Sequence, residues 1–232
     1  MSKYREKYRQ MMGGWVLLLI VLPTMLPVGL AAQSAAYYQM SARQFFALPQ
    51  LDAPLDPQQV DYALLDAAIF WYTNRERVRN NRPVARYDAA IHRVATYHAR
   101  AMARYEFMAH INPHEPAYAT LAKRSRRLGG QAVAENVASH FIHRYAPSSP
   151  YVPRRQQDGT YAYFTTSGRQ IVLHSYRSFA ESLVQAWMAS PGHRANILNP
   201  GLRKLACAVR LPAAPLGSEE IPLAYSVQNF GR

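Results

Sequence analysis

The sequence predicts an α+β fold, because its helical patterns come before two neighbouring strand candidates near its end. Segments 60–80 and 88–107 repeat apolar side chains every three or four residues, the spacing of one helix face. Segments 205–211 and 223–230 are rich in strand-forming residues, and a proline-containing turn joins them. Helices gathered first and antiparallel strands gathered late are typical of this layered class.

The composition is that of one globular domain with additional segments. The chain has 232 residues, of which 49% are hydrophobic and 12% aromatic, and these fractions exclude a disordered or fibrous protein. Cys207 is its one cysteine, which excludes an intramolecular disulfide framework and a cysteine-rich zinc site. Because Cys207 falls in the strand candidate 205–211, we expect it to be packed and unreactive.

Residues 1–32 have the pattern of an export segment. Four basic residues and one acidic residue precede the apolar run 11–32, which Pro23 and Pro27 interrupt and which ends in small residues. The pattern fits a cleaved signal peptide or an uncleaved N-terminal membrane anchor, and both place the rest of the chain outside the membrane. We therefore expect a periplasmic or extracellular protein, free or anchored by its N-terminus. Residues 33–59 have no clear period and are interpreted as a linker or arm.

The remaining chain, 60–232, is predicted to be the main domain. Asp88 is a suitable N-cap for the helix that ends near Phe107. A shorter helix over 117–128 is expected to end at the following glycine pair. Residues 140–177 are interpreted as an insertion with a hairpin turn at Asp158–Gly159. A last helix is predicted over 178–190, with Pro191–Gly192 ending it.

Three polar side chains are candidates for a functional site, because each lies in or next to a loop flanked by apolar elements. They are His110, Glu135 and His193. Two imidazoles and a carboxylate can bind a divalent metal such as zinc with water in the open position, or Glu135 can act as a base beside an imidazole. By contrast, His98 lies on the apolar stripe of its helix and is expected in the core, and His114 is expected to be a solvated loop residue.

The order of four blocks resembles the CAP superfamily, the group of cysteine-rich secretory proteins, antigen 5 and pathogenesis-related 1 proteins with an SCP domain. The blocks are "TNRERVRNNRPVARYDAAIHRVATYHARAMARYEFMAH", "AENVA", "WMASPGHRANILNPGLRKLACAV" and "YSVQNFG". They cover roughly Leu64 to Arg232 and are most similar to the exported bacterial branch. The "SPGHRANIL" block is the most specific of them.

The resemblance implies a three-layer α-β-α sandwich with a central antiparallel sheet and a cleft lined by two histidines and two glutamates. The place of the second glutamate, three residues after Trp187, is held here by Ser190, as is common in the bacterial branch. This departure argues against a four-residue metal or acid–base mechanism. Glu181 lies six residues before Trp187, and no site role is assigned to it. The other three cleft positions are filled by His110, Glu135 and His193.

Members of this family are associated with binding rather than with one common reaction, so whether the chain is an enzyme stays open. Our first hypothesis is an exported binding module for lipid, cell-wall polymer or protein, with a cleft that can hold zinc or another divalent metal at His110 and His193. The alternatives are a metal- or His/Glu-dependent hydrolase, and a membrane-tethered structural or interaction subunit with a vestigial cleft. The cleft residues are His110, Glu135, His193 and Ser190.

The net charge of +13 does not indicate a nucleic-acid partner. Part of the charge belongs to the export segment, and the rest is expected outside the membrane, away from nucleic acid. The one dense basic cluster is "KRSRR" at 123–127, which is predicted to face anionic lipid, wall polymer or solvent.

Overall fold

The computed structural model describes residues 30–232, with side chains from residue 35. The predicted export segment therefore lies almost wholly outside the described residues. Within the described part of the chain, no helix has both the length and the apolar character needed to cross a membrane.

A four-stranded sheet with the order β1-β5-β6-β2 forms the centre of the domain. Its strands are β1 (Arg86–Tyr87), β2 (Ala134–Phe141), β5 (Lys204–Arg210) and β6 (Leu223–Gly231). β6 pairs antiparallel with both β2 and β5, whereas the two-residue β1 pairs parallel with β5. The two predicted strands are confirmed as β5 and β6, and β2 is an additional strand that the sequence pattern did not indicate.

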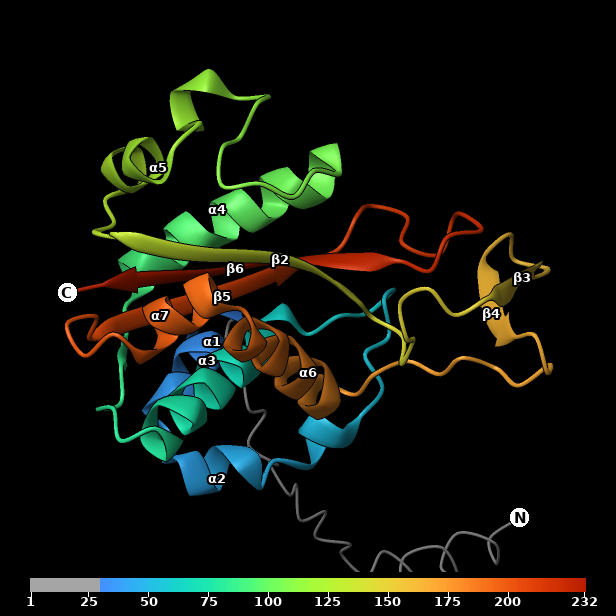
Figure 1. Ribbon diagram of the computed structural model, residues 1–232, viewed down its shortest axis with the longest axis horizontal. Helices are drawn as coiled ribbons and strands as arrows, with labels where there is room; N and C mark the ends of the chain where they lie inside the picture. Colours follow the sequence, from blue (N-terminus) through green and yellow to red (C-terminus); the bar gives the residue numbers. More distant parts are fainter. Residues whose placement is uncertain (1–29) are drawn as a thin grey trace, which may run out of the picture.

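Helices cover both faces of this sheet, so the predicted three-layer α-β-α sandwich is confirmed (Figure 1). One face carries α4 (Ala89–Tyr105), with α5 (Leu121–Leu128) packed on it. The other face carries α3 (Tyr62–Arg79), α6 (Tyr176–Ala189) and α7 (Pro191–Leu198).

The local signals at the helix ends act largely as predicted. Asp88 caps α4 by accepting hydrogen bonds from the backbone N–H groups of Ala90 and Ile91. Gly129 ends α5 in the left-handed conformation, with φ of 69°. The prediction that the helix ends at Pro191–Gly192 is confirmed, because α6 ends at Ala189. In addition, Pro191 begins α7, since proline suits the first turn of a helix.

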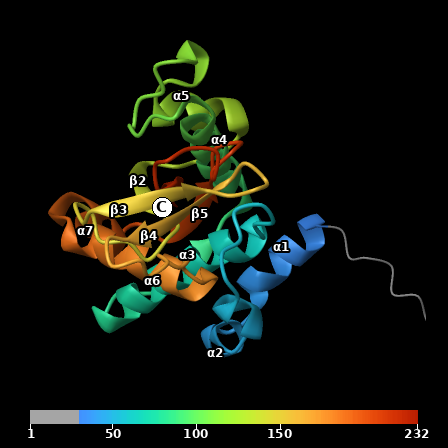
Figure 2. The ribbon, with the colours of Figure 1, turned by 90° about the vertical axis from the view of Figure 1, so that its right-hand side faces the viewer.

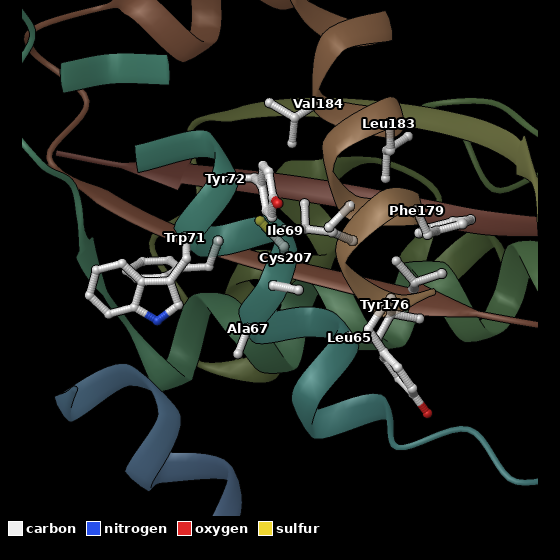
Figure 3. Close-up of a cluster of buried hydrophobic side chains, with 14 of the residues drawn as sticks. Leu65, Ala67, Ile69, Trp71, Tyr72, Tyr176, Phe179, Leu183, Val184 and Cys207 are labelled. Carbon is white, nitrogen blue, oxygen red and sulfur yellow. The ribbon is translucent and has the colours of Figure 1, made fainter. Parts of the chain in front are cut away.

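The main core lies between the sheet and the α3–α6 layer (Figure 3). Leu65 and Ile69 of α3 meet Phe179 and Leu183 of α6, and all four side chains are fully buried. Cys207 of β5 lies beneath them, and its burial raises the pKa of the thiol well above its usual range. A buried and protonated thiol is unreactive, which agrees with the sequence prediction.

Residues 33–59 are not the extended arm that the sequence indicates. They form α1 (Leu30–Gln39), α2 (Ala42–Phe46) and a 3₁₀ turn (Pro49–Asp52) along the α3 side of the molecule (Figure 2). The Trp71 indole N–H donates to the Tyr37 carbonyl oxygen over 3.0 Å, which ties α1 to α3. Because these elements are short and lack a periodic face, tertiary contacts rather than local propensity hold them in place. Their buried side chains are Tyr37, Phe45, Leu51 and Leu55.

The predicted insertion forms a hairpin that extends from the end of the sheet (Figure 1). Its strands are β3 (Tyr151–Arg155) and β4 (Tyr161–Thr165), which pair antiparallel. The turn falls at Asp158–Gly159 as predicted, with Gly159 at φ of 84°. A bridge between His143 and Leu173 closes the base of the insertion.

Candidate functional site

The candidate site lies where the first residues of β2 meet the loop that follows α4. Glu135 is the second residue of β2 and pairs with Asn229 of β6, so it lies in a strand rather than in the loop that the sequence suggests. His110 lies in the loop after α4, and α5 lies beneath this loop. The strand, the loop and α5 therefore bring together residues that are far apart in the sequence.

The Glu135 carboxylate is almost fully buried and receives several hydrogen bonds. His110 Nδ1 lies 3.1 Å from Oε1, and Arg124 Nη2 donates to Oε1 and Oε2 over 2.9 and 2.8 Å. With its amide nitrogen turned toward β2, Asn229 also donates to Oε2 over 3.1 Å. Both carboxylate oxygens are thus engaged by groups of the protein itself.

Arg124 is a site residue that the sequence analysis missed. Its side chain is 0% exposed, although the sequence places it in a basic surface cluster. Its Nη1 donates to the carbonyl oxygens of His110, Tyr118 and Ala119, so one guanidinium joins the His110 loop to Glu135. The signal that could have found it is helical spacing, because Arg124 lies on the same face of α5 as the apolar Leu121 and Leu128.

The charges of this group are coupled. Burial by itself would raise the pKa of Glu135, but the hydrogen bond from His110 and the charge of Arg124 outweigh it and lower that pKa. The hydrogen bond to Glu135 in turn raises the pKa of His110 above its usual value, against the opposing effect of burial. The site therefore combines an ionised carboxylate, a buried guanidinium and an imidazole whose charged form is favoured.

His98 lies beneath this group and is confirmed as a core residue. It is fully buried, and its Nε2 lies 2.8 Å from the Ala109 carbonyl oxygen. Burial lowers the pKa of His98 to about 4, so its imidazole is neutral at ordinary pH. A neutral imidazole supports the backbone next to His110 without adding a charge to the site.

His193 is held near the site by the backbone of α7. Asn136, the neighbour of Glu135 in β2, donates to the His193 carbonyl oxygen over 3.2 Å and accepts from Asn196 Nδ2 over 2.8 Å. The pKa of His193 is lowered by burial and then by the charge of His110, so the two imidazoles interact electrostatically. Within the described residues, this electrostatic interaction is what connects the His110 and His193 side chains.

The remaining candidates lie outside this hydrogen-bonded group. Ser190 joins α6 to α7, and its hydroxyl makes no hydrogen bond within the described part of the chain. Glu181 forms an ion pair with Arg75 over 2.7 Å, which agrees with its exclusion from the site. His114 is exposed and stacks on Tyr105, with ring centroids 4.4 Å apart.

The donor set is incomplete for zinc. A catalytic zinc site has three protein ligands and an open position, but both oxygens of Glu135 are already engaged with Arg124. Among the described residues, no group of three or more His, Cys, Asp or Glu side chains is arranged to hold a metal ion. Zinc at His110 and His193 stays a prediction, with Glu135 as a hydrogen-bond partner of His110 rather than a ligand.

A large groove of the molecule lies away from this site. It has a volume of about 670 Å³ and lies between the end of α4 and the β5–β6 connection. Arg100, Arg104 and Tyr225 contribute to its lining, and none of the four predicted cleft residues does. The volume of this groove therefore gives no measure of the His110 site.

Three comparisons with known proteins bear on this fold. No curated protein matches the chain. Solved structures that resemble it include an extracellular SCP-domain protein from Bacillus anthracis, with 19% identity, a TM-score of 0.47 and coverage of 78% of this chain and 44% of that one. An outer surface protein from Borrelia burgdorferi has 12% identity and a TM-score of 0.46, with coverage of 75% and 96%. A cysteine-rich secretory protein from Staphylococcus aureus has 10% identity and a TM-score of 0.41, with coverage of 74% and 40%.

This chain thus spans less than half of the Bacillus and Staphylococcus proteins that it resembles. The stronger finding is a match to a family model over residues 70–213, which is more than half of the chain. That range contains Glu135, Arg124 and both site histidines, together with most of the sandwich. The chain therefore belongs to the CAP family, the cysteine-rich secretory protein family.

Proposed function

We propose that this chain is an exported binding module that holds an anionic group of a cell-envelope ligand at His110 and the exposed basic side of α5. The observation that carries the proposal is the exposed imidazole of His110, which is 55% exposed while its partner Glu135 is buried. The buried Glu135 fixes Nδ1, and the accessible remainder of the ring can donate to a ligand. The export pattern of residues 1–32 and the family membership support a location outside the membrane.

The charge on the exposed side of α5 supports an anionic ligand. Lys123, Arg126 and Arg127 are exposed on α5, whose fourth basic side chain points inward to Glu135. Lys123 Nζ and Arg127 Nε donate to the carbonyl oxygens of Pro116 and Ala117, so both side chains are partly ordered. These three residues and Ala117 line a shallow hollow of about 320 Å³, which we name the α5 basic patch.

Binding fits this site better than hydrolysis does. A general base needs a free lone pair and a pKa near the working pH, whereas Glu135 has a lowered pKa and two engaged oxygens. Among the described residues of the site, a nucleophile is also missing, because the hydroxyl of Ser190, three residues before His193, makes no hydrogen bond to an imidazole that would activate it. A ligand held by donors on a rigid surface needs neither of these features.

The test is co-sedimentation of the full chain with anionic vesicles that contain phosphatidylglycerol, with neutral phosphatidylcholine vesicles, and with a phosphate-containing wall polymer. We expect binding to one anionic target that weakens with salt and falls about tenfold or more when Lys123, Arg126 and Arg127 are all changed to Gln. His110→Ala is expected to weaken the same binding. The two anionic arms distinguish lipid from wall polymer as the source of the ligand.

The matched control changes Arg154, Arg155 and Arg169 to Gln, because it also removes three positive charges and all three arginines are exposed on the insertion, whose hairpin lies at the opposite end of the sheet (Figure 1). If the control loses as much binding as the α5 variant, then binding depends only on the net charge of the protein, and the proposal is contradicted. The absence of binding to all three targets would favour the structural or interaction subunit instead.

A further inference from the structure

The environment of Arg124 is unusual for an arginine on a short surface helix. Five oxygen atoms lie within hydrogen-bond distance of its two terminal nitrogens, two from the Glu135 carboxylate and three from backbone carbonyls. The side chain is 0% exposed, and the carboxylate that it meets is 4% exposed. The protein has therefore built an oxygen-lined, water-excluded site around a positive charge.

The Glu135 carboxylate and the His110 imidazole beside it are also donors that a divalent cation such as zinc recruits in a protein. A buried carboxylate needs a countercharge, which can be a bound metal or a cationic side chain. In this chain the guanidinium supplies the countercharge and occupies both Glu135 oxygens at 2.8–2.9 Å. The same guanidinium holds the carbonyl oxygen of His110, so it also fixes the backbone that carries the exposed imidazole.

We propose that Arg124 is the resident cation of the His110–Glu135 site. Its guanidinium neutralises the Glu135 carboxylate and occupies both of its oxygens, as a divalent ion would otherwise do, so the site does not need a metal. Arg124 is thus a positioning residue, which acts on ligands through Glu135 and His110. This role of Arg124 is the same whichever ligand the site binds.

The proposal makes a prediction that a merely structural role does not: removal of the guanidinium should create a metal site. In the full chain we would titrate zinc, by calorimetry at neutral pH, into the unchanged protein, Arg124→Gln, and the double variant Arg124→Gln/Glu135→Gln. We expect Arg124→Gln to bind one zinc at least about tenfold more tightly than the unchanged protein. The double variant should lose that gain, because it lacks both the guanidinium and the carboxylate.

A smaller gain in a folded Arg124→Gln protein would overturn the proposal, and so would a gain that persists in the double variant. Tight zinc binding by the unchanged protein that is lost in Glu135→Gln would also overturn it, since Glu135 would then be free to ligate beside Arg124.

Arg124→Gln leaves a buried carboxylate without its partner and can fail to fold. In that case thermal unfolding with and without excess zinc decides the matter. Restoration of a cooperative transition by zinc, with no such restoration in the double variant, supports the resident-cation role. Failure of zinc to restore the transition overturns it.

Discussion

Asn136 donates its side-chain amide to the His193 carbonyl oxygen over 3.2 Å, and this bond fastens α7 to β2. The same fully buried side chain donates to Gln228 Oε1 and accepts from Asn196, so every polar atom of its amide is engaged across three elements. Asn136 thus helps to set the relative position of the two halves of the candidate site, Glu135 on β2 and His193 on α7, together with Asn196, which also donates to the Glu135 carbonyl oxygen.

We predict that Asn136→Ala loosens α7 before it unfolds the domain. The change leaves buried partners without hydrogen bonds, which costs about 1–3 kcal/mol of the free energy of unfolding. Urea denaturation measures the loss, and amide hydrogen exchange over 191–198 should be faster than in the unchanged protein. Gln156→Ala on the exposed hairpin turn is the control, and equal exchange rates in the two variants would contradict the role of Asn136.

We predict that Glu135→Gln lowers the pKa of His110, because the hydrogen bond to Glu135 is the main cause that raises it. A raised pKa in the folded state contributes stability that is present below the unfolded value of about 6.5 and is lost as the pH rises through the folded value. NMR titration of the His110 ring measures the shift. Glu106→Gln, at an exposed carboxyl without a bond to His110, should leave the pKa unchanged, and an unchanged pKa in Glu135→Gln as well would sink the assignment.

The base of the insertion should be sensitive to acid. Burial lowers the pKa of His143 and of His174 to about 4, and the nearby charges of His140 and Arg144 further lower that of His174. A lowered histidine pKa means that stability is full above about 6.5 and is lost as the pH falls from there toward about 4. We expect faster amide exchange over residues 142–174 at pH near 4.5 than at pH 7, after correction for the intrinsic rate.

His174→Gln is the variant that tests this prediction, since a glutamine cannot take up the proton but can still hydrogen-bond to Ser178 as His174 does. The acid-induced increase in exchange should be smaller in that variant. An increase of the same size with and without His174 would assign the acid response to other groups.

The N-terminal helices should be required for stability. Phe45 of α2 is fully buried against Trp71, with ring centroids 5.8 Å apart. Truncation of such a side chain leaves a cavity, so Phe45→Ala should lower the free energy of unfolding by about 3–5 kcal/mol. Urea denaturation measures the change, and Arg43→Ala at an exposed position of the same helix should have little effect. A loss below about 1 kcal/mol for Phe45→Ala would mean that α2 is dispensable.

The sequence predicts well the helices that have a clear pattern of apolar residues or a clear capping residue. α4 appears as an apolar stripe because it packs one face against the sheet, and Asp88 marks its start by its hydrogen bonds. α3 is recognised by its length and its apolar content instead, because it is buried on nearly all sides from Leu64 to Asn74. β2 is missed because polar residues needed at the site interrupt it, among them Glu135 and Asn136, which face partners in other elements. α1 and α2 are missed for a different reason, since aromatic contacts with α3 and not their own pattern hold them.

The site itself is predicted in part. His110 and Glu135 are found from their places in the sequence, and the structure brings them within 3.1 Å. Arg124 is missed because a charged residue in a basic run is expected at the surface. Its place on the helix face of Leu121 and Leu128 hints at burial, but the buried carboxylate that pairs with it is known only from the structure. Sequence position alone does not reveal such a pair, because its members are eleven positions apart and lie in different elements.

The packing of Tyr37 against Trp71 has a consequence for how far the domain can stand from a membrane. This contact lies in α1, five residues after the apolar run ends at Ala32. Even a fully extended chain of that length reaches less than about 18 Å. If the run remains in the bilayer, the protein has almost no tether, and its ligands must come to it at the lipid surface rather than in the outer layers of the envelope.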